Sequence, residues 1–461
     1  MEREFDICLH GATGFTGRLV AHHLARRCRE EGMRWAISGR NPGRLAALVD
    51  ELGAAGDAPE VIVADSGDPA ALDQLAARCR VVCSTVGPYA RFGTELVRSC
   101  VEQGASYLDL TGEVHWMRAM IDQFGDAADR AGVAIVHASG FDSIPSDIGV
   151  LVARGEARRR HGEEPRALRL QVERMAGGVS RGTLDSMVAL VQEALRSRDV
   201  RAIITDPRSL TPGWSAGGAG AHTGTGTSVA PGPAVLPPAG AGRSPAVAGR
   251  SQRPRSQKPR YRHRLPSGQW VMPFFMDTVN GRVVRRSIAL SAATASSAGS
   301  VESGDLGWSG ELPAYREVVC TGTGLRGFVR AMLGRVALTA LKILIMIPPT
   351  RLLLQKTVFP APGGGPDEEQ RGRGNFRITI HDEEREEALV TIEGNRDPGY
   401  GATAIMLGEA ALLLASDTTA HQSGRPSGVI TPAIAFGARI VPHLAEHGIV
   451  IAPADITPAD D

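Results

Sequence analysis

Three glycines, Gly11, Gly14 and Gly17, lie where a short apolar run ends and an amphipathic segment begins. Glycines at such a strand-to-helix turn allow a sharp turn, a close approach to phosphate and tight packing of the helix. The N–H groups at the start of that helix attract an anion. The spacing is GxxGxxG, not GxGxxG, and a plain tight turn is the alternative interpretation, but the strand-turn-helix context favours dinucleotide binding. The residues of this turn expected to bind the cofactor are Gly11, Thr13, Gly14, Phe15, Thr16 and Gly17.

A second strand-like run ends at Ser38, Gly39 and Arg40. Dinucleotide sites that prefer NAD place an acidic residue here, which binds the ribose 2′-hydroxyl. Because a guanidinium suits a 2′-phosphate, we predict that Ser38 and Arg40 bind the cofactor and that NADPH is preferred over NADH. A solvated surface arginine is the alternative for Arg40. Asp65, which follows the third run, is expected to contact the adenine or to cap the next helix.

Two further loops carry side chains suited to hydride transfer. Val86, Gly87 and Pro88 follow the fourth apolar run, and we expect them to face the nicotinamide because the carboxyl ends of parallel strands meet at one edge of a sheet. Hydride transfer often needs a group that stabilises or protonates the developing anion. The candidates by chemistry are Tyr89, Asp142 and Ser143, with Tyr400 as a further candidate. Helix capping or hydrogen bonding within a loop is the alternative role for each of them.

The absence of several motifs narrows the chemistry. None of the five tyrosines has a lysine four residues later, which disfavours the short-chain dehydrogenase class. No HExxH motif and no Cys/His cluster at metal spacing occurs, so we expect no metal site. The six cysteines form no CxxC pair, which favours buried reduced thiols. A net charge of +1 gives no pull toward nucleic acid.

The elements that must position these residues are indicated by the first third of the chain. Short apolar runs alternate there with amphipathic segments, which is typical of a parallel sheet covered on both faces. We therefore predict an α/β fold: a Rossmann-type doubly wound parallel sheet forms an NAD(P)-binding domain over residues 1–150 and precedes a mixed α/β second domain. The strands are expected at 4–10, 34–38, 60–64, 80–86, 105–110 and 132–138, and the helices at 14–31, 41–53, 69–78, 92–103 and 114–131.

In residues 151–461 apolar runs and amphipathic segments no longer alternate regularly, and we assign this region to substrate binding and dimerisation. The elements expected there are a strand at 168–174, a helix at 182–196, a hairpin at 375–395 and helices at 402–416 and 432–446. Between them, residues 211–264 are rich in Gly, Ala, Pro and Thr and then carry eight basic residues from Arg243 to Arg264. Such a tract buries too little apolar surface to fold alone. A disordered insert is therefore favoured over a tether to nucleic acid or an anionic membrane.

One apolar segment, residues 336–347, is interrupted by Lys342 and closed by Pro348 and Pro349. It is shorter than the roughly 20 apolar residues that span a bilayer. A buried helix is the favoured interpretation, and an interfacial or lipid-facing helix is the alternative. The acidic start of the chain carries no signal peptide, so we expect a cytoplasmic protein, with peripheral membrane association left open.

The motifs that carry a family resemblance occur in order along the chain: Gly11–Gly17, Ser38–Arg40, Val86–Tyr89, Tyr107–Glu113, Gly140–Asp147 and Pro398–Thr403. Together they resemble the saccharopine dehydrogenase-like oxidoreductases, and most of all their trans-acting enoyl reductase branch. The resemblance implies a Rossmann domain followed by a mixed α/β domain, a nicotinamide cofactor and a homodimer.

The same resemblance implies an activity. Members of this branch reduce a carbon–carbon double bond in a polyketide- or fatty-acid-derived lipid intermediate. The substrate would be a small molecule or a carrier-bound acyl group, supplied by a polyketide synthase in trans. Two alternatives stay open: an amino-acid or imine oxidoreductase, as the broader family name suggests, and a non-catalytic NADPH-binding sensor or scaffold.

Overall fold

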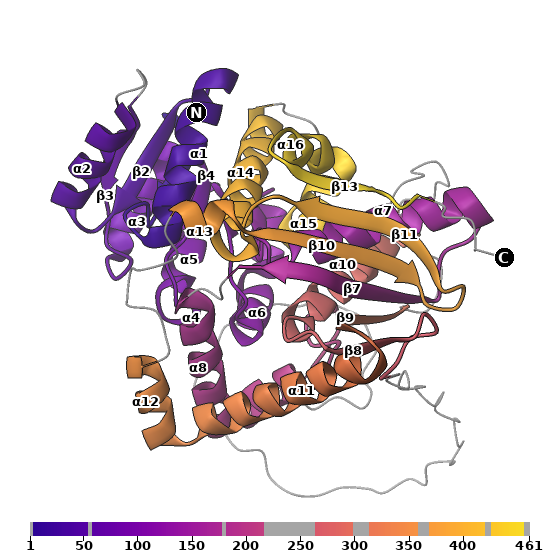
Figure 1. The fold of residues 1–461 in the computed structure, drawn as a ribbon. Coiled ribbons are helices and arrows are strands. Elements are labelled where there is room, and N and C mark those ends of the chain that lie inside the picture. Colours follow the sequence, from indigo (N-terminus) through magenta and orange to yellow (C-terminus); the bar gives the residue numbers. More distant parts are fainter. Residues whose placement is uncertain are drawn as a thin grey trace, which may run out of the picture.

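The chain folds around two β-sheets with helices packed against both (Figure 1). The structure, a computed structural model, describes residues 3–53, 58–177, 181–215, 263–297, 313–357, 368–419 and 426–455. Most of the predicted insert at 211–264 lies outside these residues.

The first sheet has seven parallel strands in the order β12-β6-β5-β4-β1-β2-β3. Its six N-terminal strands follow the order expected for a Rossmann sheet, so the predicted fold class is confirmed. The seventh strand, β12, comes from near the C-terminus and pairs with β6. It was not predicted, because three residues are too few to show a strand pattern. The strands are β1 (Phe5–His10), β2 (Trp35–Gly39), β3 (Glu60–Val63), β4 (Cys79–Ser84), β5 (Ser106–Asp109), β6 (Ala134–Val136) and β12 (Gly428–Ile430).

Helices cover both faces of this sheet, which explains why its strands are almost continuously apolar. On β1, Ile7 and Leu9 pack with α1, α2 and α14, whereas Cys8 packs with α3, α5 and α6. All six cysteines are free thiols and all but Cys320 are buried, as predicted. The covering helices are α1 (Phe15–Glu31), α2 (Pro42–Gly53), α3 (Pro69–Arg78), α5 (Thr94–Gln103), α6 (Val114–Arg130) and α14 (Thr403–Thr419).

The second sheet is mixed, with the order β13-β11-β10-β7-β9-β8. Its hairpin confirms the one predicted at 375–395, and Ile378 on β10 lies opposite Ile392 on β11. The helix predicted at 432–446 is instead two helices, α15 (Pro432–Phe436) and α16 (Ile440–Glu446), because Gly437 between them adopts a φ of 56°. The strands are β7 (Ala167–Ala176), β8 (Gln269–Pro273), β9 (Ala314–Thr323), β10 (Asn375–Asp382), β11 (Glu387–Gly394) and β13 (Ile449–Pro453).

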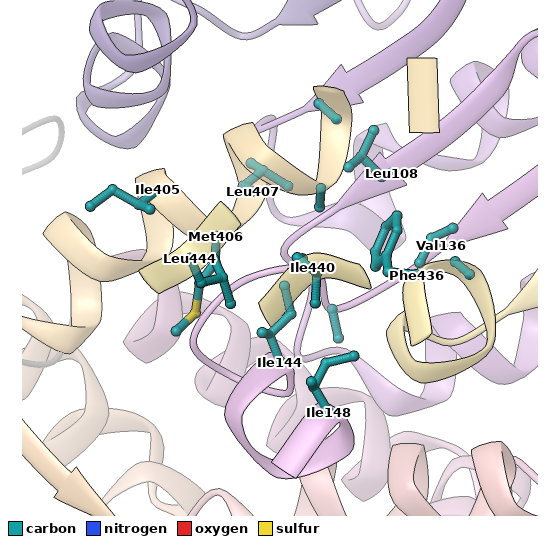
Figure 2. Packing of buried hydrophobic residues seen from close by; sticks show 14 of the residues in the cluster. Leu108, Val136, Ile144, Ile148, Ile405, Met406, Leu407, Phe436, Ile440 and Leu444 are labelled. Atoms are coloured by element: carbon teal, nitrogen blue, oxygen red, sulfur yellow. The ribbon is translucent and has the colours of Figure 1, made fainter. Parts of the chain in front are cut away.

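One hydrophobic core joins the two halves of the chain. Figure 2 shows side chains of the first sheet, of α7 (Ile144–His161), of α14 and of the C-terminal helices meeting in it: Leu108, Val136, Ile144, Ile148, Met406, Leu407, Phe436, Ile440 and Leu444. The stretch Pro398–Asp417 is long and apolar enough to cross a membrane, but 83% of its most apolar window is buried inside the protein. The helix α14 is therefore a core helix.

A buried polar cluster also ties α1 to α14. The carboxylate of Glu409 lies 2.7 Å from Nε2 of His23, 3.0 Å from Nε of Arg27 and 3.0 Å from Nε2 of His447. Burial alone would raise the pKa of Glu409, but the hydrogen bond from His23 and the charge of Arg27 lower it below its usual value. His23, Glu409 and His447 form the one group of metal-type ligands within the described ranges. Since Arg27 already neutralises the carboxylate, we interpret the group as an ion-pair cluster.

The prediction of a buried helix at 336–347 is wrong. This segment belongs to α11 (Gly324–Met346), which runs along the second sheet beside β8 and continues into α12 (Pro348–Thr357) (Figure 1). Only Gly327, Ala331 and Ile345 are buried along α11, whereas Val336 is 65% exposed. A uniformly apolar segment shows no periodicity that distinguishes a core helix from a surface helix, so the exposure of residues 336–347 could not be predicted.

Candidate functional site

The turn after β1 requires glycine at two positions. Gly11 has a φ of 87°, in the left-handed region, and a Cβ there would lie 2.6 Å from Cγ2 of Val86. A Cβ at Gly17 would lie 2.2 Å from the carbonyl oxygen of Gly11, so α1 packs closely against the turn. Gly14 is exposed at the N-cap of α1. The start of α1 therefore presents backbone N–H groups and the positive end of the helix dipole to solvent.

A cleft of about 840 Å³ opens at this turn. The predicted cofactor residues that line it are Gly11, Thr13, Gly14, Phe15, Arg40, Asp65, Val86 and Gly87. Four others, Thr16, Gly17, Ser38 and Pro88, are not part of its lining. The lining residues that sequence reasoning missed are His10, Arg18, Gly39, Asn41, Arg44, Ala64, Ser66, Thr85 and Phe92. The fold thus brings together, around this cleft, the predicted glycine turn and the carboxyl ends of β2 and β4.

Three arginines make this cleft basic. Arg18 forms an ion pair with Glu51. Arg40 and Arg44 are exposed, and no acidic side chain of the described ranges pairs with either. The backbone N–H of Arg44 donates to Oδ1 of Asn41 at 2.9 Å, which holds the start of α2 in place. Two unpaired guanidinium groups on one rim fit a phosphate beyond the pyrophosphate, and Arg44 was missed because it lies four residues past the expected position.

His10 anchors the floor of the cleft. Its Nδ1 lies 3.1 Å from the hydroxyl oxygen of Ser38 and its Nε2 lies 2.9 Å from that of Ser66. Burial lowers the pKa of His10 to about 4, so the ring is neutral at pH 7. Ser38 is fully buried and is engaged with His10. Asp65 accepts from the backbone N–H of Gly67 at 2.8 Å and does not cap α3, so contact with the adenine stays its predicted role.

Glu113 fixes the loop after β4. Its carboxylate accepts hydrogen bonds from the backbone N–H groups of Tyr89 and Ala90, both at 2.9 Å, and from the hydroxyl of Ser186 at 2.9 Å. The hydroxyl of Tyr89 donates to the carbonyl oxygen of Ser84 at 3.2 Å, and burial raises the pKa of Tyr89 well above its ordinary value. Tyr89 therefore helps to shape the loop, and its catalytic role stays a prediction.

Asp142 is the one carboxylic acid among the catalytic candidates, which also include Tyr89, Ser143 and Tyr400. Its side chain is half-buried, and Oδ2 lies 3.8 Å from the position of a Cβ built on Gly112. Within the described residues, no hydrogen bond or ion pair engages this carboxyl. Burial raises the pKa of Asp142 to about 6. A carboxyl group with such a pKa can hold or release a proton near neutral pH.

Ser143, the next residue, belongs to a buried polar network. Its hydroxyl donates to Oδ1 of Asn280 at 3.3 Å, and the amide of Asn280 donates to Glu317 at 2.9 Å. Glu317 also accepts from the hydroxyls of Ser146 and Tyr315, both at 2.7 Å, and burial raises its pKa to about 8. This network joins α7 to α10 (Asp277–Ser297) and β9. Ser143 thus has a structural partner, and its catalytic role stays a prediction.

The second half of the chain closes the far side of the site. The ring of Phe15, which lines the cleft, packs edge-on against Tyr400 with centroids 4.7 Å apart. The backbone N–H of Phe141 donates to the hydroxyl oxygen of Thr403 at 3.3 Å. The Pro398–Thr403 motif therefore contacts both the glycine turn and the loop that carries Asp142.

The parallel sheet, the glycine turn and the arginine-lined cleft define an oxidoreductase that binds a nicotinamide dinucleotide. Residues 7–136 match the family described as the saccharopine dehydrogenase NADP binding domain, so the cofactor is NADP(H). A trans-acting enoyl reductase from Mycobacterium ulcerans is 35% identical over 461 residues, 98% of each chain. One from Mycobacterium tuberculosis is 33% identical over 464 residues, again 98% of each chain. The chain belongs to the family of these trans-acting enoyl reductases.

A solved structure has a weaker likeness to this chain. Apo saccharopine dehydrogenase from Saccharomyces cerevisiae aligns with 97% of this chain and 99% of its own, at 12% identity and a TM-score of 0.44.

Proposed function

We propose that this protein reduces the carbon–carbon double bond of an α,β-unsaturated acyl thioester with NADPH. The observation that carries the proposal is the carboxyl of Asp142, which has no partner among the described residues, lies beside Gly112 in the loop after β5 and has a pKa of about 6. Two curated relatives that match this chain from end to end are named trans-acting enoyl reductase. Shared family does not by itself fix the substrate, so the assignment also needs the chemistry of the site.

The residues of the cleft fit NADPH. The turn at Gly11 and Gly14 would cradle the pyrophosphate, and Arg40 with Arg44 would bind the 2′-phosphate. When bound, NADPH supplies a hydride. Val86 and Gly87 line the end of the cleft formed by the loop after β4, where the nicotinamide would lie.

Reduction of an enoyl thioester also needs a proton at the α-carbon, and we assign its delivery to Asp142. Burial keeps a fraction of this carboxyl protonated near pH 7, because its pKa lies about one unit below that pH. A substrate that displaced water from the carboxyl would raise its pKa further. The network of Ser143, Asn280 and Glu317 would hold the Asp142 loop in place.

The word trans-acting in the relatives' names supports a second part of the proposal. We infer that the acyl substrate is a polyketide- or fatty-acid-derived intermediate that a separate synthase presents to this enzyme. Such a substrate is carrier-bound when it arrives, so the site must be reached by an acyl chain from outside.

The test is NADPH consumption by the purified chain across a panel of 2-enoyl thioesters, imines and keto acids with an amine. We expect turnover with enoyl thioesters alone and a longer acyl chain to lower KM. Turnover with the imine or keto-acid arm would instead indicate an amino-acid or imine oxidoreductase. Tight NADPH binding without turnover of any substrate would favour the sensor or scaffold.

A further inference from the structure

The outward face of α11 is apolar along its whole length. The exposed fraction is 77% for Leu325, 64% for Leu333, 65% for Val336 and 51% for Ile343. An α-helix turns about 100° per residue, so Leu325, Val336 and Ile343 lie within about 20° of one another around the axis. Leu352 on α12 adds another exposed leucine, with 55% of its surface accessible. Soluble proteins rarely expose so continuous an apolar face without a use for it.

The opposite face of α11 is fixed to the protein. Gly327, Ala331 and Ile345 are buried on this face. A Cβ at Gly327 would lie 2.2 Å from the carbonyl oxygen of Gly322, and one at Gly334 would lie 2.3 Å from the sulfur of Met272. The helix therefore approaches β8 and β9 closely and cannot roll its apolar face inward. The apolar face of α11 is therefore exposed because of the way the helix packs on β8 and β9.

Basic side chains flank the apolar face, and residues 324–357, which form α11 and α12, include no Asp or Glu. The charged residues of these two helices are all basic: Arg326, Arg330, Arg335, Lys342, Arg351 and Lys356. Measured around the helix axis from Val336, Arg326 and Arg330 lie about 80° and 120° to one side, and Lys342 lies about 120° to the other side. All three are exposed. Long basic side chains at the margins of an apolar face reach anionic headgroups while the apolar residues enter the acyl region.

We propose that α11 and the start of α12 lie flat on an anionic lipid surface. The chain bends by 113° between the two helices, and α11 is held against β8 and β9, so this is an interfacial element and not a straight span. The charges argue against a second copy of the chain as the occupant. A two-fold interface would place basic segments against each other, with no acid in either to pair with them.

The helix α8 (Arg181–Arg196) connects this surface to the active site. Val188 on α8 packs against Ile345 of α11 in a small cluster with Val191 and Leu341. Ser186 on the same helix donates to Glu113, which holds the loop after β4. The lipid-facing helix is thus one helix away from the loop expected to position the nicotinamide. This arrangement would suit an enzyme whose substrate carries an acyl chain, although the proposal does not depend on that activity.

Vesicle sedimentation of the full chain tests the proposal. We expect it to pellet with phosphatidylglycerol vesicles and much less with phosphatidylcholine vesicles, and to be released by high salt. The triple variant Leu333→Asn/Val336→Asn/Ile343→Asn should lower the partition coefficient at least about 10-fold, because each side chain loses apolar transfer energy. A second variant, Arg326→Gln/Arg330→Gln/Lys342→Gln, should remove the preference for the anionic lipid.

The matched control is Val63→Asn, which changes an apolar residue with 52% exposure on β3. It should pellet like the wild type. Equal losses in the control and in the triple variant would overturn the proposal, and so would failure of the wild type to bind either vesicle. A wild-type dimer that the triple variant converts to monomers without lipid would identify a second copy as the occupant instead. The basic-residue variant changes exposed side chains only, so it remains informative if the triple variant fails to fold.

Discussion

The cofactor side and the substrate side of this site are built in opposite ways. Every residue that lines the cofactor cleft lies between His10 and Phe92, in the first four βα units. The side that carries Asp142 is assembled instead from distant parts: Asn280 on α10, Tyr400 and Thr403 before and in α14. The cofactor side is therefore formed by consecutive βα units of the N-terminal part of the chain. The substrate side uses side chains that only the complete fold brings together.

The largest expected effect is on the substrate side. Replacing Asp142 by Asn removes the proposed proton donor, and we expect kcat/KM for an enoyl thioester to fall by about 10²–10⁴ with little change in NADPH affinity. In the wild type, kcat/KM should decline above about pH 6, because the donor is the protonated carboxyl and its pKa is about 6. Asp50→Asn, at an exposed carboxylate on α2, is the matched control and should be neutral. An unchanged rate and pH profile in Asp142→Asn would remove Asp142 from the mechanism.

A backbone change tests the cofactor side. In Gly11→Ala the new Cβ meets a positive φ and Cγ2 of Val86 at 2.6 Å, which together cost about 2–5 kcal/mol. We expect the NADPH dissociation constant to rise at least about 30-fold and the melting temperature to fall. Gly125→Ala is the control, since Gly125 lies inside α6 with open space around it. That variant should be as stable as the wild type or slightly more so, and a similar loss in both would refute the local explanation.

The floor of the cleft predicts a pH effect on stability. The pKa of His10 falls from 6.5 in the unfolded chain to about 4 in the fold. The unfolded state therefore binds the extra proton between these values, so the stability that neutral His10 contributes is present above pH 6.5 and is lost as the pH falls toward 4. Over that window the difference in unfolding free energy between wild type and His10→Asn should shrink by about 3 kcal/mol. Denaturant titrations at pH 7 and pH 4 measure it, and a constant difference would contradict the assignment.

The smallest expected effect sharpens the assignment of the cofactor. Arg40→Ala should weaken NADPH about 10- to 100-fold, which is the range for one charge-assisted hydrogen bond, and should leave NADH nearly unchanged. Arg130→Ala, at an exposed arginine near the end of α6, is the control. Equal losses for both nucleotides would mean that Arg40 does not bind the 2′-phosphate.

The same contrast explains what the sequence could predict. The order of the first six strands and the glycine turn at Gly11 follow from local apolar runs and spacing, and both are confirmed. The pairing of β12 with β6 and the hydrogen bond from Ser146 to Glu317 could not be predicted, because each joins residues more than 100 positions apart in the chain.

The two apolar helices α14 and α11 show the same limit. Both helices are apolar, yet the structure buries α14 from Thr403 to Ala415 and leaves the outer face of α11 exposed, although burial was expected for residues 336–347. The roles of individual side chains could not be predicted from the sequence either. Tyr89 and Ser143 have suitable chemistry, but only the fold shows that both hydroxyls already have partners.

The most direct test of the account follows the hydride itself. The purified chain is incubated with an enoyl thioester and with NADPH that carries deuterium at the transferred position, and the saturated product is analysed by mass spectrometry and NMR. We predict one deuterium per product molecule, located at the β-carbon, with the α-carbon proton coming from solvent. A product without deuterium at the β-carbon, or no saturated product while NADPH binds tightly, would contradict the proposed reaction.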